Sequence, residues 1–154
     1  MATILVVEDD LILLGLIAST LRQDGHIIIE TNDPLAALAV ANDRKQDIDL
    51  ILTEVSTKPI SGLELATRLV RQKISIPVLF MSGFHSVAGV LTRSLGERTL
   101  IEKPFTAPEL KKAVKNFLSR LDKDSVVRKN ADPVVKRALR VKLPAPVRTV
   151  FRSS

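Results

Sequence analysis

The stretch LILTEVSTKPISG, from Leu50 to Gly62, contains the pattern that decides the fold of this chain. It begins with three large apolar side chains in succession, as expected of a strand that is buried on both faces of a sheet. Thr53 follows them, and after it comes a single acid, Glu54. A loop of Ser, Thr, Lys, Pro and Gly then begins. The stretch therefore predicts a buried strand that carries one carboxylate at its carboxyl end.

Short apolar runs and helical patterns alternate on both sides of this stretch. Strands are predicted at 3–7, 26–31, 48–54, 76–83 and 98–103. Apolar residues at helical spacing follow each strand, over 11–25, 33–44, 61–73, 86–95 (a weaker pattern) and 106–121. Five strand–helix units in succession predict an α/β fold, in which helices cover both faces of a parallel sheet.

Residues at the helix ends support this division of the chain. Asp33 is a suitable N-cap, and Pro34 fits the first position of the helix that follows it. Thr106 is the expected cap of the last helix, and Gly25 is expected to end the first helix. For Asp10, we favour capping of the first helix over a role in ion binding.

Composition narrows the class of protein. A chain of 154 residues with 45% apolar residues can form one domain with a sizeable core. The absence of cysteine excludes disulfides and thiolate chemistry. Because no apolar run reaches about 18 residues, and no basic segment precedes the first apolar one, we expect neither a membrane span nor a signal peptide. The expected compartment is the cytoplasm.

The net positive charge of the chain comes entirely from its last 33 residues. Residues 1–121 contain 14 Lys and Arg against 14 Asp and Glu, whereas residues 122–154 contain 9 basic and 3 acidic residues. The sequence thus predicts a globular domain over 1–121 and a basic, flexible extension over 122–154. An alternative interpretation of the extension is an arm that binds nucleic acid or lipid headgroups through charge.

Chemically active side chains gather where the predicted strands end. The carboxyl ends of parallel strands meet at one edge of a sheet, where ligands bind. The residues found at these ends are Glu8, Asp9, Asp10, Glu54, Ser82 and Lys103. Clustered carboxylates repel one another unless a cation lies among them, and oxygen ligands favour Mg²⁺.

The combination of acids, a hydroxyl and an ammonium group indicates a reaction class. A lysine and a serine facing clustered acids can orient a phosphoryl group and stabilise its charge. We therefore expect phosphoryl transfer onto a carboxylate, assisted by a divalent metal. No second ligand lies at metal-binding spacing from either histidine, so His26 and His85 are expected to be surface residues.

Four segments, ILVVEDD, DLILTEVSTKPISGLEL, PVLFMSG and LIEKPF, resemble the receiver domains of two-component response regulators. The resemblance covers residues 3–121, and the motifs occur in the same order, each at a strand end. It implies a flavodoxin-like, doubly wound sheet with strand order 2-1-3-4-5.

The resemblance also implies roles for individual residues. Glu8 and Asp9 match the metal-binding acids, and Glu54 matches the phosphoacceptor, which also contacts the metal. Ser82 matches the hydroxyl that contacts the phosphoryl group, and Lys103 matches the lysine that pairs with it. Mg²⁺ is the implied cofactor, and a cis bond is implied before the proline that follows Lys103.

The sequence departs from the family pattern at Glu54, where the family has aspartate. The extra methylene displaces the carboxylate by about 1.5 Å, and a misplacement of about 1 Å can lower a rate by about 100-fold. One hypothesis is that Glu54 accepts phosphoryl groups poorly or not at all. A second is that it pairs with Lys103 and Ser82 and holds a signal-independent conformation. Leu100 also replaces the aromatic residue that accompanies switching in the family.

These features predict a single-domain response regulator that is not an enzyme and acts by binding proteins. Its partner would be a histidine kinase or another signalling protein, bound at the face formed by the fourth helix, the fifth strand and the fifth helix. Two alternatives stay open. In the first, the chain would be a true phosphoacceptor shuttle for a histidine kinase. In the second, it would be a basic-tailed protein that binds anions or nucleic acid on the same scaffold.

Overall fold

The fold was obtained as a computed structural model, which describes residues 1–83 and 99–130 and, for 125–130, the backbone alone. Its strands are β1 (Thr3–Val7), β2 (Ile27–Thr31), β3 (Leu50–Glu54), β4 (Val78–Ser82) and β5 (Leu100–Glu102). All pairs of neighbouring strands are parallel, and the order across the sheet is β2-β1-β3-β4-β5. The predicted topology is thus confirmed.

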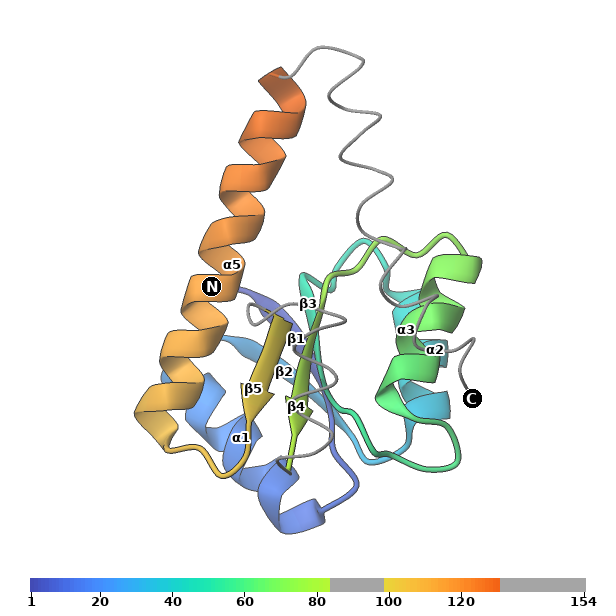
Figure 1. The fold of residues 1–154 in the computed structure, drawn as a ribbon, viewed down its shortest axis with the longest axis vertical. Coiled ribbons are helices and arrows are strands. Elements are labelled where there is room, and N and C mark those ends of the chain that lie inside the picture. Colours follow the sequence, from blue (N-terminus) through green and yellow to red (C-terminus); the bar gives the residue numbers. More distant parts are fainter. Residues whose placement is uncertain (84–98, 131–154) are drawn as a thin grey trace.

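Helices cover both faces of this sheet (Figure 1). The helices α1 (Leu11–Gln23) and α5 (Ala107–Asn130) lie on one face, and α2 (Pro34–Asp43) and α3 (Gly62–Arg71) lie on the other. The helix predicted at 86–95 and His85 fall outside the described residues. Within the described ranges, no helix combines the length and apolar character that crossing a bilayer requires.

The strand residues alternate between two apolar cores, one on each face. Ile4 and Val6 of β1 pack with α1 and α5, whereas Leu5 and Val7 pack with α2 and α3. Every residue of β3 is buried, including Thr53 and Glu54. Continuous apolar runs are needed because neither side of the central strands faces water.

The predicted helix caps are present. Asp10 caps α1, because its Oδ1 accepts hydrogen bonds from the backbone N–H groups of Ile12 (3.0 Å) and Leu13 (3.1 Å). Asp33 caps α2 by accepting from the N–H of Leu35 at 2.9 Å. These side chains satisfy N–H groups that have no partner within their own helix.

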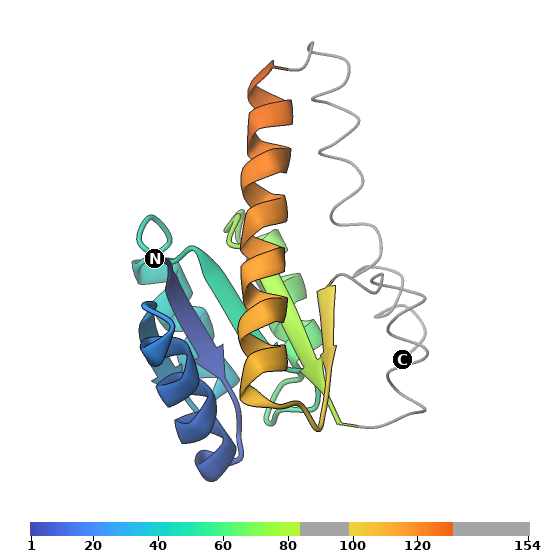
Figure 2. The ribbon, with the colours of Figure 1, turned by 90° about the vertical axis from the view of Figure 1, so that its left-hand side faces the viewer.

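The last helix also begins as predicted, but it ends later. Thr106 and Glu109 form a reciprocal capping box at its start. The helix was expected to end near Leu121, whereas α5 continues nine residues further, to Asn130, and extends past the sheet in Figure 2. No glycine or proline interrupts the sequence between Leu121 and Asn130, so nothing local ends the helix there.

His26 differs from its expected placement at the surface. Its side chain is only 10% exposed, and Nδ1 accepts a hydrogen bond from the backbone N–H of Ala2 at 3.1 Å. The expectation was wrong because the imidazole satisfies a backbone donor just before β1. This contact lies at the amino ends of β1 and β2, remote from the carboxyl ends of the strands.

Candidate functional site at the carboxyl ends of the strands

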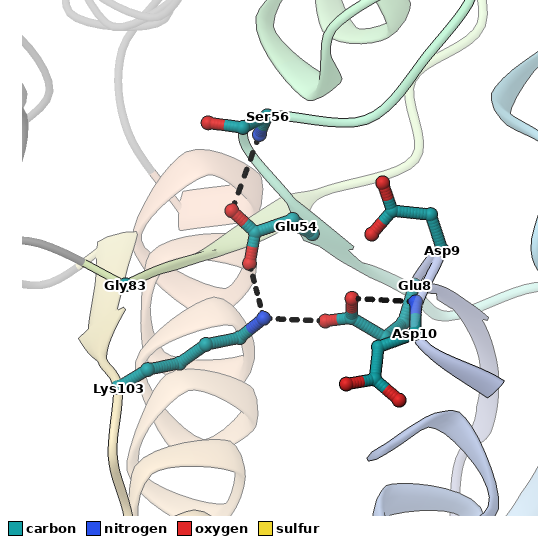
Figure 3. A pocket seen from close by; sticks show the side chains of 7 residues that line it. All are labelled: Glu8, Asp9, Asp10, Glu54, Ser56, Gly83 and Lys103. Atoms are coloured by element: carbon teal, nitrogen blue, oxygen red, sulfur yellow. Dashed lines mark hydrogen bonds and ion pairs between the residues drawn. The ribbon is translucent and has the colours of Figure 1, made fainter. Parts of the chain in front are cut away.

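An acidic pocket of about 400 Å³ lies at the carboxyl ends of the strands (Figure 3). Glu8 and its two acidic neighbours follow β1, Glu54 ends β3, and Lys103 follows β5. The pocket is lined by Glu8, Asp9, Asp10, Glu54, Ser56, Gly83 and Lys103. Among the residues that the structure describes, four carboxylates and one ammonium group therefore line one small hollow.

Lys103 connects two of these acids. Its Nζ lies 2.6 Å from Oε2 of Glu8 and forms a second ion pair with Oε2 of Glu54. Glu8 is 1% exposed and Glu54 is 6% exposed, so both carboxylates are largely removed from water. The ammonium group supplies a counter-charge to both, and this arrangement ties β1, β3 and β5 together at their carboxyl ends.

The second oxygen of each glutamate is held by the backbone. Oε1 of Glu8 accepts from the N–H of Asp10, and Oε1 of Glu54 accepts from the N–H of Ser56, each at 3.2 Å. Three of these four oxygens therefore accept a hydrogen bond, and Oε2 of Glu54 is held by its ion pair with Lys103. A buried carboxylate with a lysine and a backbone donor on its two oxygens is fixed in position.

The backbone of Glu54 is positioned by a close approach of α3. Gly62 donates a hydrogen bond to the carbonyl oxygen of Val55 at 2.8 Å, and Oγ1 of Thr53 donates to the carbonyl oxygen of Glu54 at 2.9 Å. A Cβ atom at position 62 would overlap that carbonyl oxygen of Glu54. Glycine is therefore required at this position by space alone.

Burial and ion pairing have opposing effects on the pKa values of Glu8 and Lys103. Burial raises the pKa of Glu8 above its ordinary value of 4.5, and the attraction of Lys103 offsets this only in part. Burial alone would lower the pKa of Lys103, but its interactions with Glu54 and Glu8 outweigh burial and raise it above 10.5. Lys103 therefore stays positively charged throughout the neutral range.

The predicted metal ligands Glu8, Asp9 and Glu54 line one pocket, and their role as metal ligands stays a prediction. Among residues 1–83 and 99–130, no three or more His, Cys, Asp or Glu side chains are arranged to hold a metal ion. Glu8 and Glu54 instead direct one oxygen each at the ammonium group of Lys103. The donor types suit Mg²⁺, but as arranged the positive charge between the two glutamates is supplied by the protein.

The sequence-predicted residues are brought together to different degrees. Glu8, Glu54 and Lys103 are in direct contact, and Asp9 lines the same pocket. Ser82 ends β4, is 3% exposed and accepts a hydrogen bond from the N–H of Lys103 through its carbonyl oxygen at 2.7 Å. Its hydroxyl does not line the pocket, and its contact with a phosphoryl group stays a prediction.

Two features of the site were missed by sequence reasoning. Ser56 lines the pocket and donates its N–H to Glu54, and its position two residues after the acid in a tight loop could have indicated this. The second missed feature is a cis bond between Lys58 and Pro59. The cis bond between Lys103 and Pro104, by contrast, is present as predicted.

Known proteins share this fold and sequence pattern. The family described as "Response regulator receiver domain" matches residues 4–115. A two-component response regulator-like protein of Arabidopsis thaliana, APRR9, is 33% identical over 121 residues, which is 77% of this chain and 26% of that protein. The response regulator SaeR of Staphylococcus aureus is 24% identical over 126 residues, which is 80% of this chain and 53% of that protein.

Solved structures agree with these relatives. A receiver domain protein from Clostridium thermocellum aligns with a TM-score of 0.69 at 23% identity, over 79% of this chain and 98% of that one. NtrX from Brucella abortus aligns with a TM-score of 0.74 at 28% identity, over 84% of this chain and 29% of that one. The match over residues 4–115, together with the sheet order and the acids at the strand ends, identifies this chain as a member of the response regulator receiver domain family of two-component signalling.

Proposed function

We propose that this receiver domain signals through protein contacts and does not accept a phosphoryl group at position 54. The supporting observation is that the carboxylate of Glu54 is already engaged on both oxygens, by Lys103 and by the N–H of Ser56. A carboxylate that attacks phosphorus needs an accessible oxygen at a fixed distance from its metal and its lysine. Glu54 is 6% exposed and one methylene longer than the family's aspartate.

The same contacts support a conformation that does not depend on a signal. The contact between Glu54 and Lys103 joins the carboxyl ends of β3 and β5 without covalent modification. Leu100, at the start of β5, lacks the aromatic ring that changes position in the family. Glutamate at position 54 and leucine at position 100 act in the same direction, since each replaces a residue that the switching mechanism of the family uses.

Partners and compartment follow from this proposal. The domain over residues 1–121 would bind a histidine kinase or another cytoplasmic signalling protein, with no reaction of its own. The face that the family uses includes β5 and α5, both of which lie in the described part of the chain. The extension over 122–154, with 9 basic and 3 acidic residues, would add an anionic partner through charge, and raising the salt concentration would weaken that contact.

Mg²⁺ would bind weakly on this proposal. A metal ion at Glu8, Asp9 and Glu54 would have to displace the ammonium group of Lys103, or share two carboxylates with it. Two cations so close together repel each other strongly in a partly buried site. Weak Mg²⁺ binding and absent phosphoryl transfer are therefore consequences of the same ion pairs.

Incubation with a small acyl-phosphate donor and Mg²⁺, followed by intact-mass measurement, tests the proposal. The natural protein should remain unmodified, and Glu54→Asp should gain a phosphoryl adduct together with a change in its melting temperature on addition of the donor. Glu64→Asp, the same substitution on the surface of α3, is the matched control and should behave like the natural protein. A stoichiometric adduct on Glu54 of the natural protein would refute the proposal.

A further inference from the structure

The outer edge of β2 pairs with no strand in the part of the chain that the structure describes. β2 is the first strand in the order β2-β1-β3-β4-β5, and its other edge pairs with β1. Its sequence, three isoleucines followed by glutamate and threonine, is rich in β-branched residues, which favour strands. An open edge of this kind offers backbone N–H and C=O groups to a further strand, and proteins usually obstruct it.

The hydrogen bonds to β1 show which backbone groups of β2 point outward. The N–H of Ile27 donates to the carbonyl oxygen of Ala2 at 2.9 Å. The carbonyl oxygen of Thr31 accepts from the first residue after β1 at 3.2 Å. Because the direction of these groups alternates along a strand, the N–H and C=O groups of Ile28 and Glu30 point away from the sheet.

Arg22, in the last turn of α1, occupies this outer edge. Its Nη2 donates to the outward carbonyl oxygen of Ile28 at 3.2 Å and to Oε2 of Glu30 at 2.8 Å. The contact with Glu30 is an ion pair between side chains that are 49% and 34% exposed. One nitrogen therefore bridges the backbone of one outward residue and the side chain of the next.

The position of this guanidinium group matters more than the strength of its ion pair. Surface pairs of such exposure change the folding equilibrium by less than about fivefold, because water screens them and two long side chains must be ordered. A further strand would lie about 4.8 Å from β2, with an N–H nitrogen about 2.9 Å from the carbonyl oxygen of Ile28. Nη2 of Arg22 already holds that place.

A second copy of β2 would fit this edge if Arg22 did not occupy it. In an antiparallel pair, two residues that lie opposite one another can exchange both of their N–H···O bonds. Ile28 of one copy would pair in this way with Glu30 of the other, and the two-fold axis would pass through Ile29. This register is favoured because it uses both outward residues of each copy.

We propose that Arg22 closes the outer edge of β2 against a second copy of this chain, by holding the carbonyl oxygen with which that copy would pair. A symmetric dimer uses the same residues on both copies, and an open strand edge provides such a self-complementary surface. With the edge closed, addition of a strand is not a route by which this domain associates.

Arg22→Met tests the proposal, because methionine keeps an unbranched side chain and removes the donor. In sedimentation velocity of the full chain over a range of concentrations, this variant should dimerise at concentrations at least about tenfold lower than the natural protein. The matched control is Arg71→Met, which removes an exposed arginine from the last turn of α3 and should associate like the natural protein. Equal association of all three proteins would overturn the proposal.

Amide hydrogen exchange identifies the edge at which the variant associates. In Arg22→Met, the N–H groups of Ile28 and Glu30 should exchange more slowly as the concentration rises, because pairing protects them. The N–H of Ile27, which is bonded to Ala2, should be protected at every concentration in both proteins. Protection that rises with concentration elsewhere and not at Ile28 and Glu30 would contradict pairing at β2.

Proline at position 30 tests the register. The double variant Arg22→Met with Glu30→Pro lacks the outward N–H that pairing requires, and the bonds to β1 are made by the residues on either side of position 30. This double variant should associate as weakly as the natural protein. If it dimerises as readily as Arg22→Met alone, the pairing of Ile28 with Glu30 is ruled out.

Discussion

Nζ of Lys103 lies 2.6 Å from Oε2 of Glu8, although 95 positions separate the two residues in the sequence. Glu8 follows β1 and Lys103 follows β5, and two strands, β3 and β4, lie between them in the sheet. The lysine side chain therefore reaches across the carboxyl edge of the sheet, where Glu54 meets it from β3. One ammonium group stabilises two buried carboxylates from different strands.

Removal of this ammonium group should destabilise the fold. Lys103→Met leaves Glu8 and Glu54 buried without a counter-charge, and breaking such a pair from one side costs about 3 kcal/mol. Urea unfolding at neutral pH measures the loss. Lys112→Met, on an exposed position of α5, removes the same charge without a buried partner and should change the free energy of unfolding by less than about 0.5 kcal/mol. Equal losses in the two variants would contradict the role of Lys103.

The pKa of Glu8 predicts a dependence of stability on pH. Burial raises this pKa in the folded protein above its ordinary value of 4.5. Between 4.5 and the raised value, the folded state binds more protons than the unfolded state, so this carboxyl makes folding less favourable as pH rises. The free energy of unfolding of the natural protein should therefore fall, relative to that of Glu8→Gln, as pH increases from about 4.5.

The comparison for Glu8 needs unfolding curves of both proteins at several pH values. Glu102→Gln, at an exposed position of β5, is a suitable control and should run parallel to the natural protein. If the natural protein and Glu8→Gln also run parallel above pH 4.5, the carboxyl of Glu8 does not titrate as its burial requires.

Affinity for Mg²⁺ should increase when Lys103 is replaced by methionine. Without the ammonium group, the carboxylates of Glu8 and Glu54 have no counter-charge, and a divalent cation can neutralise them together with Asp9. We expect Mg²⁺ to bind the variant at least about tenfold more tightly than the natural protein, since one competing cation has been removed. Calorimetric titration, or the rise in melting temperature with added Mg²⁺, measures this. Unchanged affinity would mean that Lys103 does not compete with the metal.

Two glycines near the pocket should differ sharply in their tolerance of alanine. Gly62→Ala introduces a Cβ that overlaps the carbonyl oxygen of Glu54, so α3 and β3 must move apart. We expect a loss of about 1–3 kcal/mol, the range for overpacking at a buried site. Gly83→Ala places its Cβ at an ordinary contact distance, 3.7 Å from Cδ of Lys103, and should have a small effect. Thermal unfolding of the two variants side by side provides the measurement.

Much of the fold could be predicted because its signals are local. The apolar runs of β1 and β3 predict strands buried on both faces, and Asp33 and Thr106 mark helix starts through bonds made within three residues. The end of α5 was missed for the opposite reason. No local residue ends the helix after Leu121, and an amphipathic pattern shows only where a helix stops contacting the core.

The site was predicted as a set of residues but not as a set of contacts. The positions of Glu8, Glu54 and Lys103 follow from the strand ends, and the length of glutamate indicates the pairing of Glu54 with Lys103. The bond from Lys103 to Glu8, and the backbone donors of Asp10 and Ser56, depend on which rotamers the surrounding backbone allows. Such choices between nearby partners are made by tertiary structure and leave no pattern in the sequence.

The length and direction of α5 have a consequence for the side from which a partner reaches the acidic pocket. The helix starts beside the carboxyl ends of the strands and runs away from them, so that Asn130 lies at the end opposite the acidic pocket (Figure 1). The nine residues after Leu121 carry the chain about 13 Å further along the helix axis. The carboxylates of the acidic pocket thus lie at one end of the described structure, and α5 ends at the other. A second protein that contacts Glu54 and Lys103 would therefore meet the molecule at the end opposite the one where α5 stops.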